Sequence, residues 1–513
     1  MGLSVWLDAG ALSGRHGLLG AVHSWGAWTV RFVLAFAVFV AVFGARKARL
    51  ALQRIAGQLP EIPVSRRILA AHFGALLVFI AVSARLFGGA GGDFLAWFWL
   101  AAGATAVALA ASAVMPPALW LQVVRGMGKA CVYAAIAAIA ACALGNSGRS
   151  LWVPLARLTF GVVTALLRPF LGGITADPAS LTIGTARFAV IIAPECSGFE
   201  GAGLMLLFAI AWLWICRGEC RFPQALVLIP VGVSMAWLLN AVRIAALILI
   251  GNAGAQAIAM GGFHSQAGWM AFIALALGFS VAARRAPWIA ARQPERAPGG
   301  VFSENPTAAY LMPFLAILAS AMLSRAASSG FEWFYPIRLL AAAAMLWMFR
   351  RKLATLDWRC GWPAVALGSL VFLLWLGLDR LLGGQAGNAM PSALAASPAP
   401  ARIGWLASRV LAAVVTVPIA EELAFRGFLL RRLISSDFES ITFRTFTYVS
   451  LFASSLAFGL LHGRLWLAGA LAGLIYAFAL LRRGRMGDAV AAHATTNALL
   501  AAWVLGFNQW HLW

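Results

Sequence analysis

Charge is scarce in this chain of 513 residues. Asp, Glu, Lys and Arg together make up 11% of it, whereas a typical soluble domain carries roughly 25%. Acidic residues are the scarcest, because 17 Asp and Glu face 39 Lys and Arg. With 62% hydrophobic residues, this composition excludes an ordinary soluble globular protein.

Cysteine is also scarce, with six residues that are scattered and show no disulfide framework. Cys216 and Cys220 form a CxxxC motif without a nearby histidine, which argues against a zinc site there. No HExxH motif is present either. The sequence therefore predicts no bound metal and no other cofactor.

Long apolar runs are the main positive feature, and a run of about 20 helical residues crosses a bilayer. We count about fourteen such runs by this criterion, abundant in the small residues that favour close helix packing in lipid. They predict an all-α, polytopic transmembrane helical bundle. The runs cover residues 28–44, 69–87, 94–114, 130–144, 204–216, 223–239, 269–283, 309–323, 335–349, 362–378, 405–420, 447–461, 465–481 and 489–505.

The net charge of +22 does not indicate a nucleic-acid-binding protein. Basic residues gather in short stretches between the apolar runs, at 46–67, 284–296, 350–352 and 482–485. This is the pattern of a multi-pass protein whose basic loops stay in the cytoplasm. We expect the lipid bilayer as partner, no nucleic acid, and a bacterial inner membrane. With the 46–67 loop in the cytoplasm, residues 146–203 form a long external loop.

A stretch rich in Pro, Arg and Gly divides the apolar runs into two groups. Such a composition is typical of a linker. The sequence therefore predicts a transmembrane domain over residues 25–285, a linker over 286–306 and a second transmembrane domain over 307–508. We find no motif that repeats between the halves, as the halves of many transporters do.

Three chemically distinctive residues of the first half are expected on the external side. Cys196 lies in APECSGFEG, Arg243 just past the sixth run, and His264 just before the seventh. A thiol near His or Arg can attack a carbonyl, His can transfer the proton, and Arg can hold an oxyanion. Each has a plainer explanation as well: an apolar filler, a membrane anchor or a structural histidine.

The order APECSG, NAVRI and FH on a multi-span scaffold resembles the exosortase family, membrane cysteine transpeptidase-like enzymes that process C-terminal sorting signals of exported proteins. The resemblance covers about residues 25 to 285. It implies Cys196 as nucleophile, His264 as base and Arg243 as the group that stabilises the transition state. The implied substrates are exported proteins with a C-terminal sorting tail.

The second half carries three polar motifs against apolar runs: EELAFR, FGLLH and HATTN. Ionisable residues in such places default to functional candidates. A buried carboxylate can act as a general base on water, and His or Asn can hold that water or an oxyanion. Three alternatives stay open: an intrahelical ion pair, hydrogen bonding between the histidines, and a zinc site. The candidate residues are Glu421, Glu422, Arg426, His462, His493 and Asn497.

The motifs EExxxR, FxxxH and HxxxN resemble the CPBP family of CAAX-type intramembrane metallo/glutamate proteases, over about residues 305 to 508. The resemblance implies Glu421 as the water-activating base, with Glu422 and Arg426 as its support. It implies that His462, His493 and Asn497 bind water or the oxyanion. A simple count of spans places His462 far from Glu421, so their convergence requires a tilted, broken or re-entrant segment.

The two resemblances together are similar to an exosortase E/protease fusion of VPEID-type sorting systems. They predict a membrane peptidase in which a cysteine unit processes sorting signals and an intramembrane endopeptidase unit is fused to it. The alternative is a membrane transporter or a non-catalytic assembly scaffold, because intramembrane Glu, Arg and His also serve proton relays.

Overall fold

The computed structural model describes residues 18–40, 44–55, 66–87, 92–193, 196–291, 304–382 and 389–513. Within them, nine helices are long and apolar enough to cross a membrane, or ten if the bent pair Pro117–Met127 and Lys129–Ala140 is one span. Four further apolar helices are shorter. The prediction of an all-α polytopic transmembrane bundle is confirmed, and the chain is a multi-pass membrane protein.

Two compact units divide the chain. The first consists of residues 1–158, 194–232 and 288–291, and the second of residues 159–193, 233–287 and 292–513. The predicted division at a linker over 286–306 stays a prediction, and residues 292–303 of that linker lie outside the described residues.

The first unit is built on antiparallel apolar helices and includes the beginnings of α6 and α8. A short amphipathic helix, α2, packs its apolar side against α5, through Ala51 and Ile55 on one side and Leu119 and Val123 on the other. The basic residues expected in a loop at 46–54 therefore lie on a helix. The elements are α1 (Leu18–Phe39), α2 (Ala45–Ile55), α3 (Arg66–Arg85), α4 (Asp93–Val114), α5 (Pro117–Met127), α6 (Lys129–Leu167), α7 (Phe199–Ile215), η6 (Gln224–Val227) and α8 (Leu228–Asn252).

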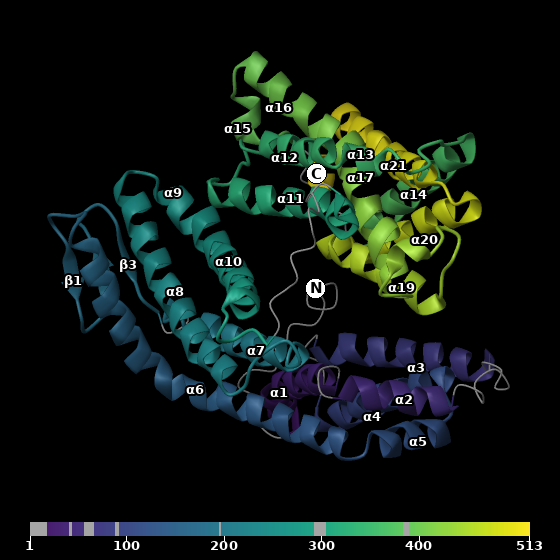
Figure 1. Cartoon of the computed structure of the whole chain (residues 1–513), viewed down its shortest axis with the longest axis horizontal. Coiled ribbons are helices and arrows are strands. Elements are labelled where there is room, and N and C mark those ends of the chain that lie inside the picture. The colour runs from purple at the N-terminus through teal and green to yellow at the C-terminus, as the bar shows by residue number, and fades with distance from the viewer. Residues whose placement is uncertain are drawn as a thin grey trace. The chain divides into compact units, whose positions relative to one another are not determined.

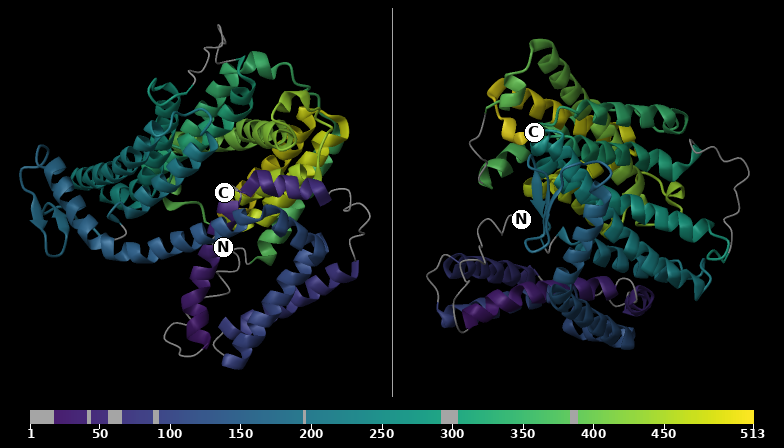
Figure 2. Two further views of the ribbon diagram at one scale, coloured as in Figure 1. Left: turned by 60° about the horizontal axis from the view of Figure 1, so that its bottom comes forward. Right: turned by 90° about the vertical axis from the view of Figure 1, so that its left-hand side faces the viewer.

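The predicted loop over residues 146–203 is wrong at both ends, because α6 continues to Leu167 and α7 begins at Phe199. The apolar residues of 152–167 extend the helix although Pro154 and Arg157 interrupt their pattern. Three short strands follow α6 and form an antiparallel sheet in the order β1-β2-β3 (Figure 2). They are β1 (Thr175–Asp177), β2 (Thr182–Gly184) and β3 (Ala189–Ile191).

The second unit contains the remaining helices, among them one long helix that runs from Ala399 to Arg432 with two π-helical stretches (Figure 1). Its later elements are α9 (Gln256–Ile258), η7 (Ala259–Phe263), α10 (His264–Arg285), α11 (Pro306–Ala326), α12 (Pro336–Met348), α13 (Arg350–Leu353), α14 (Trp362–Leu381) and α15 (Ser392–Ala395). The long helix comprises α16 (Ala399–Leu411), η9 (Ala412–Thr416), α17 (Val417–Glu422), η10 (Leu423–Leu429) and α18 (Leu430–Arg432). After it come η11 (Phe438–Ser440), α19 (Tyr448–Leu460), η12 (Gly463–Leu465), α20 (Trp466–Arg483), α21 (Met486–Phe507) and η13 (Trp510–Leu512).

Small residues let the helices of the second unit approach closely. A Cβ at Gly459 on α19 would lie 2.5 Å from the carbonyl oxygen of Trp466 and 2.6 Å from the nitrogen of Ala470. The two backbones are therefore in direct contact, as small residues allow in membrane proteins. The apolar core around them includes Phe425, Phe458 and Tyr476.

A polar cluster fixes the start of α21. The buried carboxylate of Asp488 accepts hydrogen bonds from Arg483 Nε at 2.8 Å and from the main-chain N–H of Gly361 at 3.1 Å. In the adjacent loop, hydrogen bonds from the side chain and N–H of Arg359 lower the pKa of Asp357 to about 2. The bond between Gly361 and Asp488 ties the residue before α14 to the start of α21, the helix that carries His493.

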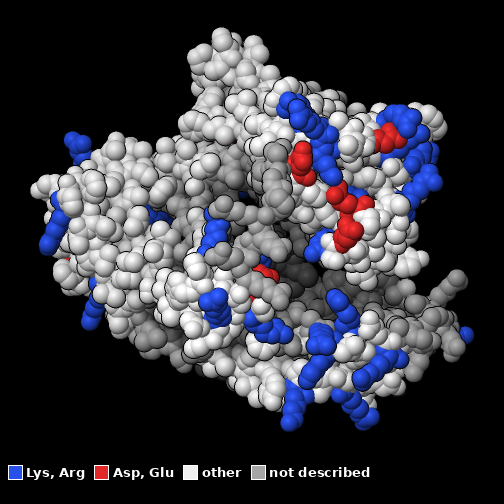
Figure 3. Space-filling view, viewed as in Figure 1, with Lys and Arg blue, Asp and Glu red and all other residues white. Residues whose placement is uncertain are grey.

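Most of the surface on the face shown in Figure 3 is uncharged, and Lys and Arg are more frequent there than Asp and Glu. This agrees with a surface that largely contacts lipid, because charged side chains are costly in the hydrocarbon layer.

Candidate active site in the C-terminal helices

A buried ion-pair network joins the long helix to α21. Glu422 is fully buried, and its Oε2 lies 3.1 Å from Nε of Arg426, one helical turn later. Its other oxygen, Oε1, accepts a hydrogen bond from Nδ1 of His493 at 2.9 Å. The carboxylate therefore links the long helix to α21 through His493, and the intrahelical ion pair with Arg426, one of the alternatives left open by the sequence, is present.

Aromatic rings surround the guanidinium of Arg426. Its Cζ lies 4.2 Å from the ring centre of Phe458 and 5.5 Å from that of Tyr476. Its Nη2 donates to the carbonyl oxygen of Gly473 at 3.1 Å. Nη1 is buried and, among the described residues, has no hydrogen-bond partner. The ring faces offset part of the cost of burying this charge.

Glu421 differs from its neighbour. Its side chain is 14% exposed, and its Oε2 lies 3.8 Å from Nε2 of His493. This separation exceeds a direct hydrogen bond and fits two groups that share one water molecule. The two adjacent glutamates therefore have different surroundings: Glu422 is fully buried and pairs with Arg426 and His493, whereas Glu421 is partly exposed and lies farther from His493.

His493 lies between the two glutamates in a defined orientation. Because a carboxylate only accepts hydrogen bonds, Nδ1 of His493 carries the proton that it donates to Glu422. Nε2 of the neutral ring is then an acceptor, and it faces Glu421. The ring of Tyr476 stacks on His493, with centroids 4.7 Å apart and an angle of 15° between the planes.

His462 joins this group through Phe458. Nδ1 of His462 lies 3.0 Å from the carbonyl oxygen of Phe458, and the two rings are 4.9 Å apart. The ring of Phe458 also meets that of His493 edge-on at 5.7 Å. The simple span count placed His462 far from Glu421, but α19 has only 13 residues, shorter than the run of about 20 that crosses a bilayer.

Asn497 follows His493 by one turn of α21, and its Nδ2 donates to the carbonyl oxygen of Ala413 at 2.8 Å. Ala413 lies in the π-helical stretch η9 of the long helix. Such widened turns rearrange the main-chain hydrogen bonds and are frequent at functional sites. The second stretch, η10, begins directly after Glu422.

The structure thus brings together Glu421, Glu422, Arg426 and His493, with His462 one aromatic ring away and Asn497 one helical turn away. Sequence reasoning missed Tyr476, which contacts both His493 and Arg426. The one available signal was a tyrosine in the middle of an apolar run, in a chain with five tyrosines. Within the described residues, no group of three or more His, Cys, Asp or Glu has an arrangement suited to a metal ion.

The first-half candidates divide between the two units. Arg243 lies inside α8 rather than past its end, because the helix continues to Asn252. Its Nη2 lies 3.2 Å from Nδ1 of His264 and 3.1 Å from the His264 carbonyl oxygen. Cys196, half-buried, belongs to the other unit. Its predicted meeting with the Arg243–His264 pair stays a prediction.

The contact with Arg243 fixes the tautomer of His264. A guanidinium only donates hydrogen bonds, so Nδ1 of His264 accepts. In the neutral ring Nε2 therefore carries the proton. In this arrangement His264 can donate a hydrogen bond through Nε2, and it can accept a proton at Nδ1 only when Arg243 releases that atom.

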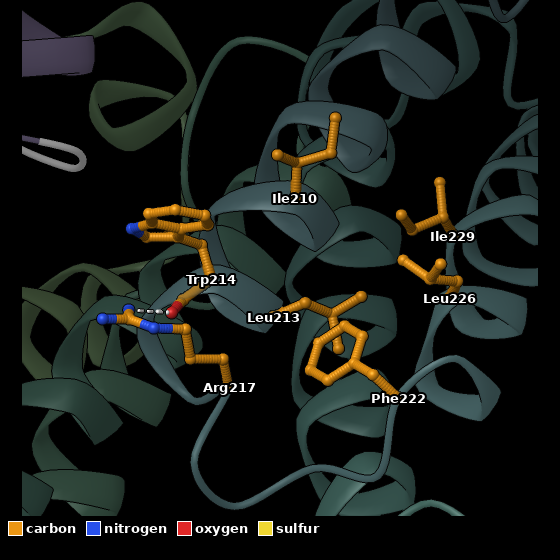
Figure 4. Close-up of a pocket in the computed structure, with 7 residues that line it drawn as sticks. All are labelled: Ile210, Leu213, Trp214, Arg217, Phe222, Leu226 and Ile229. Carbon is orange, nitrogen blue, oxygen red and sulfur yellow. Dashed lines mark hydrogen bonds between the residues drawn. The ribbon is translucent and has the colours of Figure 1, made fainter. Parts of the chain in front are cut away.

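A separate apolar cavity of about 410 Å³ lies in the first unit, between α7 and the segment that leads into α8 (Figure 4). Its lining is apolar except for Arg217, which donates to the carbonyl oxygen of Trp214 at 2.8 Å. None of the sequence-predicted site residues lines it. It is therefore distinct from both candidate constellations.

Comparison with known proteins agrees with the C-terminal site. That comparison supports an intramembrane peptidase as the class of protein for the C-terminal helices. Residues 403–499 match the family model of Rce1-like proteins, type II CAAX prenyl endopeptidases. The matched segment begins in α16 and ends in α21, so it contains all six C-terminal candidate residues. No curated protein and no solved structure matches the chain.

Proposed function

We propose that the C-terminal helices form an endopeptidase that cleaves peptide bonds within or beside the membrane, with Glu421 as general base. The observation that carries this proposal is the difference between the two adjacent glutamates. Glu422 is fully buried and held by Arg426 and His493. Glu421 keeps partial exposure and faces an acceptor nitrogen across 3.8 Å. A water that donates to both Glu421 and His493 Nε2 has its oxygen lone pairs directed away from them.

The reaction then runs in two steps. Glu421 takes a proton from the water as the water oxygen attacks the scissile carbonyl carbon, and a tetrahedral oxyanion forms. As the C–N bond breaks, protonated Glu421 gives that proton to the leaving amine, so the carboxylate is regenerated. The network of Glu422 and Arg426 holds His493 in the orientation that this requires.

Asn497 and His462 have complementary roles in this proposal. One N–H of the Asn497 amide is used by Ala413, and the other is suited to donate to the oxyanion. Because Nδ1 of neutral His462 donates to Phe458, its Nε2 is an acceptor and suits a water or a substrate N–H.

We further propose that residues 25–285 act as an exosortase-like unit in a bacterial inner membrane. Cys196 would attack a carbonyl in the C-terminal tail of an exported protein and form a thioester with loss of the amine. Water or an acceptor nucleophile would then release the acyl group. The direct contact between Arg243 and His264 supports this proposal, since the sequence predicted these two residues to act together. Arg243 must release Nδ1 if His264 is to take the thiol proton.

The experiment uses the full chain, with the wild type or Cys196→Ala expressed beside a reporter whose tail is cleaved in the native host. Mass spectrometry of the reporter follows its size. Tail loss that requires Cys196 supports the cysteine unit, and the terminal mass separates hydrolysis from transfer. Equal tail loss in both strains removes Cys196 from the mechanism. If Glu421→Ala also changes no fragment, a transporter or a non-catalytic scaffold replaces the peptidase proposal.

A further inference from the structure

Three arginines gather where three helices of the second unit begin or end. Arg325 lies in the last turn of α11, Arg338 in the first turn of α12 and Arg409 in the last turn of α16. Helix α12 packs against both α11 and α16 (Figure 1), and the loop between α11 and α12 carries Glu332. We call Arg338, Arg409 and the two rings that they contact, those of Tyr335 and Trp513, the Arg409 cluster.

Glu332 is occupied by two of the arginines. It pairs with Arg325 Nε at 3.1 Å and with Arg338. Ser324 also donates to it, and Trp405 donates to its main-chain carbonyl oxygen at 3.0 Å. The carboxylate of Glu332 therefore already has partners and does not pair with Arg409. Nε of Arg338 is buried and has no hydrogen-bond partner within the described residues.

Arg409 makes neither a hydrogen bond nor an ion pair with any residue in the part of the chain that the structure describes. Its guanidinium carbon lies 4.4 Å from the ring centre of Tyr335 and 5.3 Å from that of Trp513. Its Nε is buried. A half-buried guanidinium held between two rings, with its N–H donors unused, carries a desolvation cost that an anion would offset.

The charge balance of the cluster points the same way. Three guanidinium groups face a single carboxylate among the described ion pairs, that of Glu332, which leaves an excess positive charge. Arginine is the residue best suited to bind phosphate, because its planar fork donates two parallel hydrogen bonds. The cluster is therefore built to receive one further anion.

The surroundings favour the phosphate of a lipid as that anion. Trp333 and Phe334 beside the cluster are 39% and 49% exposed, and aromatic side chains at helix ends gather at headgroup depth. The exposed residues Ile337, Leu340 and Trp347 form an apolar stripe along α12, spaced as one face of a helix. An acyl chain can lie on this stripe while its headgroup meets Arg409.

We propose that the Arg409 cluster binds the phosphate of an anionic phospholipid, with the acyl chains along α12. The binding site is separate from Glu421, which lies twelve residues later on the same long helix, and it does not depend on the proposed peptidase activity. The phosphate oxygens accept hydrogen bonds from Arg409 and from Nε of Arg338.

The experiment measures lipid retention by native mass spectrometry on the full-length protein, stripped of lipid in mild detergent and titrated with phosphatidylglycerol. Arg409→Gln is expected to weaken retention of the tightest-bound lipid about tenfold, because it removes a charge-assisted bidentate contact. The matched control is Arg402→Gln, which removes the same charge from the same helix, where Arg402 donates to the Ala395 carbonyl oxygen. It is expected to retain lipid as the wild type does.

Two further arms make the result decisive. Glycerol phosphate, which has the same phosphate chemistry without chains, is expected to compete poorly, and equal binding of it would overturn the assignment to a lipid. Equal retention of phosphatidylglycerol by wild type and Arg409→Gln would overturn the site itself. If Arg409→Gln does not fold, Arg409→Lys keeps the charge without the planar fork. Reduced retention by that variant supports the site, and unchanged retention refutes it.

Discussion

Two adjacent glutamates have opposite relations to the protein around them. Glu422 has two protein partners and no exposure, whereas Glu421 keeps partial exposure and no direct hydrogen bond to His493. A carboxylate that activates water needs access to water, as Glu421 has. A buried carboxylate that pairs with a buried arginine, as Glu422 does, is needed for the stability of the fold. At the scale of single residues, therefore, substitutions at the two positions have separable effects.

Glu422→Gln is predicted to destabilise the protein by about 3–5 kcal/mol, because it leaves the buried Arg426 without its counter-charge. Glu421→Gln is predicted to change stability by less than about 1 kcal/mol, since it removes no direct ion pair of Arg426. Thermal unfolding of both variants in detergent measures the difference. Equal destabilisation by the two substitutions would show that the glutamates share one structural role.

Tyr476→Leu is predicted to reduce peptidase activity strongly while it lowers the melting temperature only slightly. The substitution removes the ring that stacks on His493 and faces Arg426, and an aromatic contact of this kind contributes about 0.5–1.5 kcal/mol. Tyr476→Phe keeps the ring and is the matched control. The measurement is product formation beside the melting temperature of each variant, and equal activity of the two variants would contradict a role for the stacked ring.

At the scale of helices, the site depends on the close crossing of α19 and α20. Gly459→Ala is predicted to destabilise the protein by about 1–3 kcal/mol, because the added methyl group meets backbone atoms that cannot move aside. Gly506→Ala on α21 is the matched control, since a Cβ there meets nothing within 4 Å. Melting temperatures of the two variants test this, and similar values would mean that the crossing tolerates a wider spacing.

The helices that carry the C-terminal motifs were predictable from the sequence because their apolar runs are long and their polar residues recur at helical spacing. Residues 152–167 were not recognised as helix, because Pro154 and Arg157 interrupt the apolar pattern. The π-helical stretches were also missed, since π turns leave no periodic signal in so short a segment. Glu422, Arg426 and His493 were identified as candidates, but their contacts depend on packing between helices far apart in the chain.

At the scale of the whole molecule, the chain combines an Rce1-like segment over residues 403–499 with a long stretch that carries a different set of polar residues. In the proposed mechanisms the two constellations use different chemistry, a carboxylate in one and a thiol in the other. The account therefore predicts two independent sets of products, one lost with Glu421 and the other lost with Cys196.

The most direct test of the central claim, that Glu421 is the base of an intramembrane endopeptidase, compares native-host cells that carry the wild type, Glu421→Ala or Cys196→Ala. Mass spectrometry quantifies the terminal peptides of membrane and exported proteins in each strain. The account predicts a set of cleavage products that is present with the wild type and with Cys196→Ala and absent with Glu421→Ala. Identical terminal peptides in the wild-type and Glu421→Ala strains, with the variant folded and equally abundant, would contradict it.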